Sequence, residues 1–331
     1  MSKKERKIAI FYEHPDWFQP LFAELDRRRI AFDRIDAANH GFDPHESESY
    51  EIFFNRMSAS AYLRGHENAI FYTRNLLHHL ALKRVRVVNG EISFALETSK
   101  AMQLSLLDSL CVGHPRTVVV NSSERALRAV EQIGFPSVIK PNIGGRGAGI
   151  VRFDRIAEVR DALETGAINV GPDGTSLVQE YVPKRGGCIQ RVETLGGKFL
   201  YGLKIYASDE NFNLCPAEVC RTDNVPPSGE VCPTNGLANG LRIEKFDPPA
   251  SVIKTVERVV RVAEIDVGGV EYLIDDRTGE PLFYDINALS NFVTGANELI
   301  GFDPHEKLVD FLEKELSLCD TDTGYRSSAA G

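Results

Sequence analysis

The sequence lacks the features of several protein classes. Its 331 residues include only six cysteines, too few for the disulfide framework of a small secreted domain. Basic residues are not in excess, because 38 Lys and Arg stand against 47 Asp and Glu, a net charge of −9. Such a balance argues against a surface built to hold a nucleic-acid backbone. We therefore expect a reducing, cytoplasmic location and no nucleic-acid partner.

Long hydrophobic runs are also missing. No run approaches the ~20 apolar residues that a membrane-spanning helix needs. The first apolar stretch, residues 8–12, is too short for the core of a signal peptide. The composition, 43% hydrophobic and 26% charged, is that of an ordinary soluble globular protein. We expect no membrane partner; the oligomeric state stays open, and a homo-oligomer is compatible with the sequence.

Strand and helix patterns alternate in the N-terminal third. Short apolar runs predict strands, and apolar residues at helical spacing between them predict helices. This alternation is typical of an open α/β sheet with parallel strands. The predicted strands are residues 8–12, 30–35, 52–54 and 87–89, and the predicted helices cover residues 18–25 and 69–82.

The pattern changes after about residue 97. Helices now accompany β-patterns paired around glycine-containing turns, which predicts an α+β region. The pairs are residues 137–140 with 149–153, and 269–274 with 282–286. The last residues show no apolar periodicity and predict a disordered tail. The predicted division is therefore an N-terminal domain of residues 1–97, a second region of residues 98–316 and a tail of residues 317–331.

The most informative segment is the glycine-rich loop of residues 144–149, which follows Lys140. Its four glycines allow backbone N–H groups to approach an anion closely. The loop matches neither the Walker pattern nor G-x-G-x-x-G, and H-R-D and D-F-G kinase motifs are absent. A strand, a glycine loop and a second strand instead indicate a flap over the phosphates of a nucleotide. A structural hairpin turn with an incidental lysine is the alternative.

A second segment gathers carboxylates on a predicted hairpin. In an antiparallel pair, a turn centred on Thr278 places Glu271 opposite Asp285. Alternation of side chains puts Asn287 on the same face and turns Tyr284 away. Like charges that face each other are destabilising, so the pair predicts a bound cation, and hard oxygen ligands suit Mg²⁺. The alternative is a solvated hairpin face.

The order of these motifs resembles the ATP-grasp superfamily, and especially its RimK-like carboxylate–amine ligases, which include the ribosomal-protein glutamate ligase. Lys100 at a helix start and Lys140 before the flap come first, then a strand ending in Gln179–Val182, then the carboxylate hairpin. The resemblance implies an N-terminal open parallel α/β domain followed by a two-lobed ATP-grasp fold. Its nucleotide flap lobe would cover residues 115–182 and its metal-binding lobe residues 183–316.

The resemblance also implies cofactors and site residues. The cofactors are ATP and two Mg²⁺ ions, with Mn²⁺ as an alternative, and the metal ligands are Glu271, Asp285 and Asn287. Gln179–Val182 would form the hinge between the two lobes, and the backbone of Glu180 and Val182 would pair with adenine. Arg191 matches a basic position near the transferred phosphate, and Lys204 is a looser candidate for the same catalytic role. The implied nucleotide-binding residues are Lys100, Lys140, Gly144, Gly145, Arg146, Gly147, Ala148, Gly149, Gln179, Glu180, Tyr181 and Val182.

The activity implied is ATP-dependent ligation of a carboxylate to an amine through an acyl phosphate. The substrates would be a small-molecule or peptide carboxylate and an amine such as an amino acid. Two alternatives stay open: an ATP-binding regulator or scaffold with this fold, and a phosphotransferase that stops after phosphorylating its substrate.

Departures from the family pattern concern the substrate. After Asn287 the chain reads Ala-Leu-Ser-Asn-Phe, where the family commonly has Ser-Pro-Gly. Ile189 replaces an acidic residue that often precedes the Arg191 position. These changes leave the predicted ATP and metal sites intact but leave the acceptor unidentified. Cys215, Cys220 and Cys232 have no histidine nearby and no C-x-x-C pair, which disfavours a zinc site.

Overall fold

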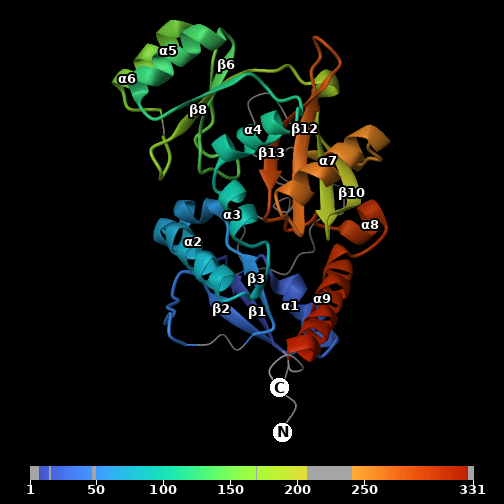
Figure 1. Ribbon diagram of the computed structural model, residues 1–331. Helices are drawn as coiled ribbons and strands as arrows, with labels where there is room; N and C mark the ends of the chain where they lie inside the picture. The colour runs from blue at the N-terminus through green and yellow to red at the C-terminus, as the bar shows by residue number, and fades with distance from the viewer. Residues whose placement is uncertain (1–6, 15, 47–49, 169, 207–240, 327–331) are drawn as a thin grey trace, which may run out of the picture.

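The computed structural model describes residues 7–14, 16–46, 50–168, 170–206 and 241–326. Within these residues the chain builds three sheets, each from its own stretch of sequence. In Figure 1 the N-terminal sheet lies at the bottom, a green lobe at the upper left and an orange and yellow lobe at the upper right. The cysteines at positions 215, 220 and 232 lie outside the described residues.

The N-terminal sheet is open and parallel, in the order β2-β1-β3-β4, which confirms the architecture expected from the alternating pattern. Its two central strands are short apolar runs and are almost completely buried, as strands covered on both faces must be. The elements are β1 (Ile8–Tyr12), α1 (Gln19–Arg27), β2 (Phe32–Asp36), β3 (Ile52–Arg56), η1 (Ala59–Arg64), α2 (Glu67–Leu82) and β4 (Arg86–Val88).

The second sheet is antiparallel, in the order β5-β8-β6-β7, and packs against helices α5 and α6. Strands β6 and β7 form the predicted hairpin around the glycine loop, with Ile139 opposite Val151. The side chain of Ser122 accepts a hydrogen bond from the Arg125 amide and so begins α5. The elements, with the two helices that precede the sheet, are α3 (Glu91–Glu97), α4 (Lys100–Ser109), β5 (Thr117–Val120), α5 (Ser123–Ile133), β6 (Ser137–Pro141), β7 (Val151–Phe153), α6 (Ile156–Glu164) and β8 (Ser176–Glu180).

The third sheet is also antiparallel, in the order β11-β10-β9-β12-β13. Its last two strands are the predicted carboxylate hairpin, and Glu271 is paired with Asp285 as the sequence indicated. The elements are η2 (Arg185–Gly187), β9 (Cys188–Leu195), β10 (Lys198–Tyr206), β11 (Arg242–Lys245), α7 (Ala250–Val262), β12 (Val267–Ile274), β13 (Pro281–Asn287), α8 (Ala296–Ile300) and α9 (Pro304–Arg326).

Helix α9 corrects the predicted tail. It continues to Arg326, so residues 317–326 are helical rather than irregular. Leu312 and Leu316 are buried, and Cys319 packs against the same core, so the apolar face continues at helical spacing beyond residue 316. Within the described part of the chain, none of the helices combines the length and the apolar composition that a membrane crossing requires.

Asn89 joins the N-terminal part of the chain to the third sheet. Its side chain pairs with the backbone of Val267 as a strand residue would, because Oδ1 accepts from the amide at 3.0 Å and Nδ2 donates to the carbonyl at 2.7 Å. The same Nδ2 also donates to the carbonyl of Ala288. Asn89 has a φ of +55° and is buried, a conformation that asparagine tolerates better than most residues. The domain boundaries near residues 97 and 182 stay predictions.

A buried carboxylate also ties α1 to α9. Glu24 accepts hydrogen bonds from Arg27 and Arg28, and Arg28 continues to Asp310 and Glu313 on α9. The Arg27 and Arg28 hydrogen bonds outweigh the effect of burial and lower the pKa of Glu24 to about 2. One hydrophobic core, with residues from both the N-terminal and the third sheet, lies beneath this cluster.

We expect Glu24→Gln to lower the free energy of unfolding by about 1–3 kcal/mol at neutral pH, because it breaks charge-assisted hydrogen bonds. The depressed pKa means that the stabilisation is complete above about pH 4.5 and is lost as the pH falls toward about 2. The difference between variant and wild type, measured by chemical denaturation, should therefore shrink on acidification. Asp26→Asn, at an exposed position on the same helix, is the control. Equal stability of wild type and Glu24→Gln at neutral pH would contradict this account.

Candidate active site

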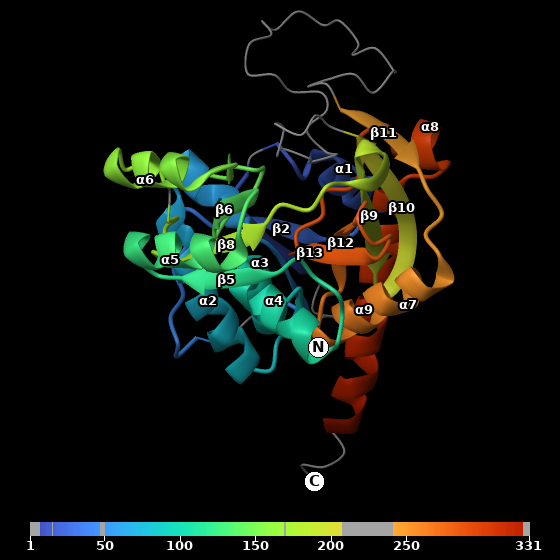
Figure 2. The same cartoon turned by 90° about the horizontal axis from the view of Figure 1, so that it is seen from above.

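A cavity lies where the three sheets approach one another. Figure 2 shows β5, β6 and β8 of one antiparallel sheet to the left of β9, β10, β12 and β13 of the other. Its walls come from the segment after β3, from the glycine loop, from the end of β8 and from strands β9, β12 and β13. The structure thus brings together residues that are far apart in the sequence. The predicted site residues that line the cavity are Lys100, Lys140, Gly144, Gly145, Arg146, Gly147, Ala148, Gln179, Glu180, Tyr181, Val182, Arg191, Glu271, Asp285 and Asn287.

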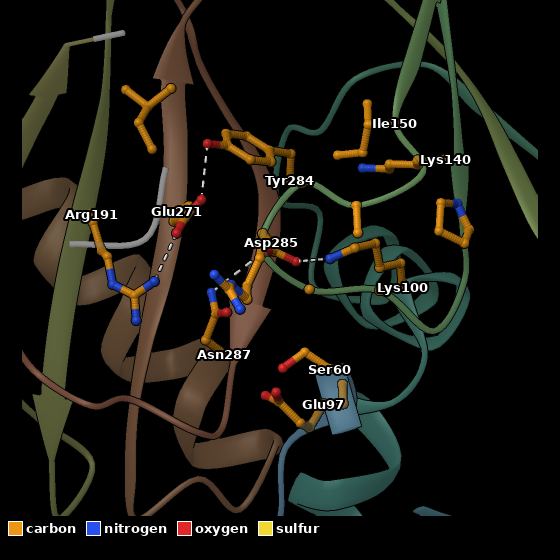
Figure 3. A pocket seen from close by; sticks show the side chains of 18 of the residues that line it. Ser60, Glu97, Lys100, Lys140, Ile150, Arg191, Glu271, Tyr284, Asp285 and Asn287 are labelled. Atoms are coloured by element: carbon orange, nitrogen blue, oxygen red, sulfur yellow. Dashed lines mark hydrogen bonds and ion pairs between the residues drawn. The ribbon is translucent and has the colours of Figure 1, made fainter. Parts of the chain in front are cut away.

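The two facing carboxylates are each paired with a basic side chain. Arg191 Nη1 donates to Glu271 Oε1 at 2.7 Å, and Lys100 Nζ donates to Asp285 Oδ1. In Figure 3 the two carboxylates project between Arg191 on one side and the lysines on the other. Burial would raise the pKa of Asp285, but the charge of Lys100 keeps that pKa below its ordinary value. Burial also raises the pKa of Glu271, against the opposing effect of Arg191.

Tyr284 does not turn away from the cavity, and this part of the hairpin prediction was wrong. Its hydroxyl donates to Glu271 Oε2 at 3.0 Å. The pairing of β12 with β13 shifts beyond Glu271, so that Tyr272 faces Phe283 and Tyr284 is the extra residue of a β-bulge. A bulge breaks the alternation of side chains and points two successive residues to one face. The sequence carried no signal for this bulge.

Two acids at or beside the cavity, Glu193 and Glu97, were missed from the sequence. Glu193 Oε1 accepts from Arg191 Nε at 2.6 Å, and its side chain is fully buried. Because Glu193 lies two residues after Arg191 on the same strand, strand periodicity could have found it. Glu97 Oε2 accepts from the amides of Ala288 and Leu289, which holds the segment after β13. Burial raises the pKa of Glu97.

The two lysines differ in their surroundings. Burial would lower the pKa of Lys100, but its ion pair with Asp285 raises it above the usual value. Lys140 is 5% exposed, and burial together with the charge of Lys100 lowers its pKa to about 7. An anion placed beside Lys140 would favour its charged form. The cavity therefore offers positive charge to an anionic ligand.

The side chains of the hinge residues contact residues in both antiparallel parts of the chain. Glu180 accepts from the Arg116 amide at 2.8 Å and from Arg277 at 3.1 Å. Gln179 donates to Thr117, and the Arg152 guanidinium lies 4.1 Å from the ring centre of Tyr181. The Glu180 amide is itself bonded to the carbonyl of Arg116. The Glu180 amide is therefore already occupied and is not available to a ligand at this strand end.

The structure does not bring Lys204 or Gly149 to the cavity wall. Arg191 pairs with Leu203, so Lys204 lies on the opposite face of the sheet. There its Nζ is 4.7 Å from the ring centre of Phe246. The predicted catalytic role of Lys204 is therefore at odds with the strand register. Gly149 has a φ of +74°, which a turn at the base of the flap requires.

The oxygen atoms at the centre of the cavity suit a hard cation. Asn287 Nδ2 donates to Asp285 Oδ2 at 3.5 Å, which leaves Asn287 Oδ1 as a ligand atom beside the two carboxylates. Lys100 and Arg191 already place positive charge against these carboxylates, as a metal ion would. In the described ranges, no group of three or more His, Cys, Asp or Glu could hold a metal by itself. Two carboxylates and one amide fit Mg²⁺, which takes few protein ligands together with phosphates.

The tip of the glycine flap rests on the N-terminal part of the chain. A Cβ added to Gly145 would lie 2.9 Å from Ser60 Cβ, a distance too short for a carbon–carbon contact. The Ser60 amide donates to Ser58 Oγ at 3.1 Å, and the two serine hydroxyls share a hydrogen bond of 2.8 Å. The absence of a side chain at position 145 therefore allows the flap to close on η1.

Residues 85–219 match the family model of the RimK-like ATP-grasp domain. A probable alpha-L-glutamate ligase of Mannheimia succiniciproducens is 24% identical over 243 residues, 73% of this chain and 72% of the relative. The crystal structure of the D-cycloserine synthetase DcsG superposes with a TM-score of 0.65 at 16% identity, over 94% of this chain and 99% of the other. A D-alanine–D-alanine ligase of Bacillus anthracis in complex with ATP gives a TM-score of 0.64 at 14% identity, over 97% and 100%.

The fold is therefore the ATP-grasp fold, as the order of the motifs implied. Within that class, the match over residues 85–219 confirms the resemblance to the RimK-like proteins.

We expect Gly145→Ala to loosen the closed flap, because the added methyl group collides with Ser60 Cβ. Amide hydrogen exchange of residues 144–149 should be about fivefold faster or more than in wild type. Gly144→Ala is the matched control, since its Cβ would meet nothing nearer than 3.5 Å. Equal exchange in the two variants would show that the contact with Ser60 does not hold the flap.

Proposed function

We propose that the protein is an ATP-dependent carboxylate–amine ligase that forms an amide bond through an acyl phosphate. The observation that carries this proposal is the single cavity in which the flap, two lysines, Arg191 and the carboxylate hairpin converge. The names of the relatives, a glutamate ligase and a D-alanine–D-alanine ligase among them, support the same reaction class. The proposed substrates are an amino acid or peptide and a second carboxylate or amine of similar size.

ATP would lie between the flap and the third sheet. Lys100 and Lys140 supply positive charge for the phosphates, and the glycine loop supplies backbone donors. The hinge backbone at Glu180 and Val182 is the proposed adenine contact. A peripheral charge would do little here, but these lysines are buried, where charge acts through a low dielectric.

Glu271, Asp285 and Asn287 are the proposed ligands of Mg²⁺. Bound there, the ion would neutralise charge on the transferred phosphate. Each carboxylate would then exchange its present cation for the metal, and Arg191 and Lys100 would be released toward the phosphates. We propose two ions, with Mn²⁺ as a substitute, because two carboxylates and an amide can be shared between neighbouring metals.

The proposed chemistry has two steps. An oxygen of the substrate carboxylate bonds to the γ-phosphorus of ATP, the bond to the ADP oxygen breaks, and ADP leaves. The amine nitrogen then bonds to the carbonyl carbon, and the carbon–oxygen bond to phosphate breaks while the amine loses a proton. Arg191, which Glu193 still holds through Nε, would stabilise the transferred phosphate. The flap, seated on Ser60, excludes water that would hydrolyse the acyl phosphate.

The direct test measures ADP release by the purified protein with a panel of amino acids and acidic peptides, and reads the products by mass spectrometry. We expect ADP formation that depends on both an acid and an amine, with a product of their summed mass less one water. ADP and a phosphorylated acid formed without any amine would indicate a phosphotransferase instead. ATP binding without turnover on the whole panel would favour a regulatory protein.

We expect Glu271→Gln and Asp285→Asn each to lower the rate of ADP formation about 100-fold or more and to raise the Mg²⁺ requirement of the residual activity. Each change keeps the size of the side chain but removes a charge that faces the metal. Stability should fall, because Arg191 or Lys100 is left buried without its partner. Glu280→Gln, on the exposed turn of the same hairpin, is the control. Wild-type rates at every Mg²⁺ concentration in either variant would remove that residue from the metal site.

A further inference from the structure

Arg56, the last residue of β3, is a buried cation without a carboxylate partner. It is 3% exposed and its guanidinium carbon lies about equally far, at 5.0 and 5.2 Å, from the ring centres of Phe18 and Phe54. No described carboxylate is within ion-pair distance, and its Nε and Nη1 have no hydrogen-bond partner among the described residues. Burial lowers the pKa of Arg56 to about 9, although Glu97 and Glu193 act against this from a distance. Burying a charged side chain without an ionic partner costs stability, which points to a role of Arg56 in its remaining contacts.

The one nitrogen of Arg56 that is hydrogen-bonded holds the segment that follows β13. Nη2 donates to the Ser290 carbonyl at 2.5 Å and to Asn291 Oδ1 at 3.0 Å. The segment is fixed further by the amide of Phe292, which donates to Ser290 Oγ, and by the amide of Val293, which donates to the Tyr201 hydroxyl. These bonds position Asn291 before any ligand arrives.

The bond to Arg56 also decides which way the Asn291 amide points. A guanidinium has only donors, so the oxygen of the amide must be the atom that faces Arg56. The two N–H donors of Nδ2 are then the atoms left for other partners, and Asn291 lines the cavity. The positive charge of Arg56 polarises the amide and makes these N–H groups stronger donors. Two N–H donors on Asn291 with a cation behind them favour an anionic oxygen.

Asn291 lines the cavity together with Ser58 and Ser60, which follow Arg56 in the chain, and with Trp17. None of these residues is among those proposed to bind ATP or Mg²⁺. They can therefore contact another substrate in the same cavity.

We infer that Asn291, oriented by Arg56, recognises a carboxylate of the substrate that is ligated, so that this substrate carries a carboxylate besides its reacting group. The inference rests on the proposed function for the identity of the site. Asn291 is the contact residue and Arg56 is a positioning residue. The carboxylate belongs either to the amine substrate or to the acid substrate, and both place the same chemistry against Nδ2.

The test variant is Asn291→Asp, which keeps the shape of the side chain, removes both donors and gives Arg56 an ionic partner. We expect KM for the substrate that carries the recognised carboxylate to rise about 10- to 100-fold. KM for ATP should not change, and the melting temperature should stay the same or increase. Amino acids are compared with their carboxamides, first as the amine and then as the acid, so that the arms show which substrate is recognised. Asn297→Asp makes the same charge change at an exposed position outside the cavity.

The role of Arg56 is tested by the preference for carboxylate over carboxamide. Arg56→Met should lower this ratio about tenfold through KM rather than kcat, and Arg56→Lys should restore part of it, as expected of a residue that acts through Asn291. A wild-type ratio in Asn291→Asp in both arms would overturn the inference.

A binding measurement separates this inference from the proposed activity. With ADP and Mg²⁺ present, carboxylate-bearing amino acids should raise the melting temperature of wild type more than their carboxamides do, and Asn291→Asp should lose that difference. This result without any turnover would contradict the ligase and support the carboxylate site. Turnover in which wild type uses carboxylates and carboxamides equally well would support the ligase and contradict the carboxylate site.

Discussion

The buried charges at the centre of the cavity are the constraint on which the rest of the site depends. Glu271 and Asp285 face each other across two strands, and such a pair is unstable unless cations lie beside it. Arg191 and Lys100 meet that need from two different parts of the chain. Because breaking a buried pair is costly, the third sheet, α4 and the carboxylate hairpin are held in one arrangement.

Amide side chains join the parts of the chain that carry these charges. The side chain of Asn89 forms hydrogen bonds with the backbone of Val267 at the start of β12. Gln103 of α4 does the same for β13, since it exchanges hydrogen bonds with both backbone groups of Ile286. In each case a buried side-chain amide takes the place of a strand and satisfies backbone groups that have no strand partner on that side in the described part of the chain. The position of Lys100 relative to Asp285 thus follows from the Gln103 contact one turn along the same helix.

Two groups of residues in the cavity lining differ in how they are built. The glycine flap and the two lysines, which we propose bind the nucleotide, are the motifs that the sequence displays in order. A second group comes from the segment after β3 and from the segment after Asn287, where this chain departs from the family pattern. Arg56 and Asn291 belong to that departure, which is why they bear on the substrate and not on ATP.

The sequence by itself determined the parallel N-terminal sheet, the two hairpins, the facing of Glu271 and Asp285 and the resemblance to the RimK-like proteins, because period, turn residues and motif order are local properties of the chain. Only the tertiary structure decided the inward turn of Tyr284, which depends on a bulge, and the position of Lys204 on the far face of its sheet, which depends on strand register. It also paired Arg191 with Glu271 and Arg56 with Asn291. Such contacts join residues on separate strands and loops, and a one-dimensional pattern does not record which of them meet.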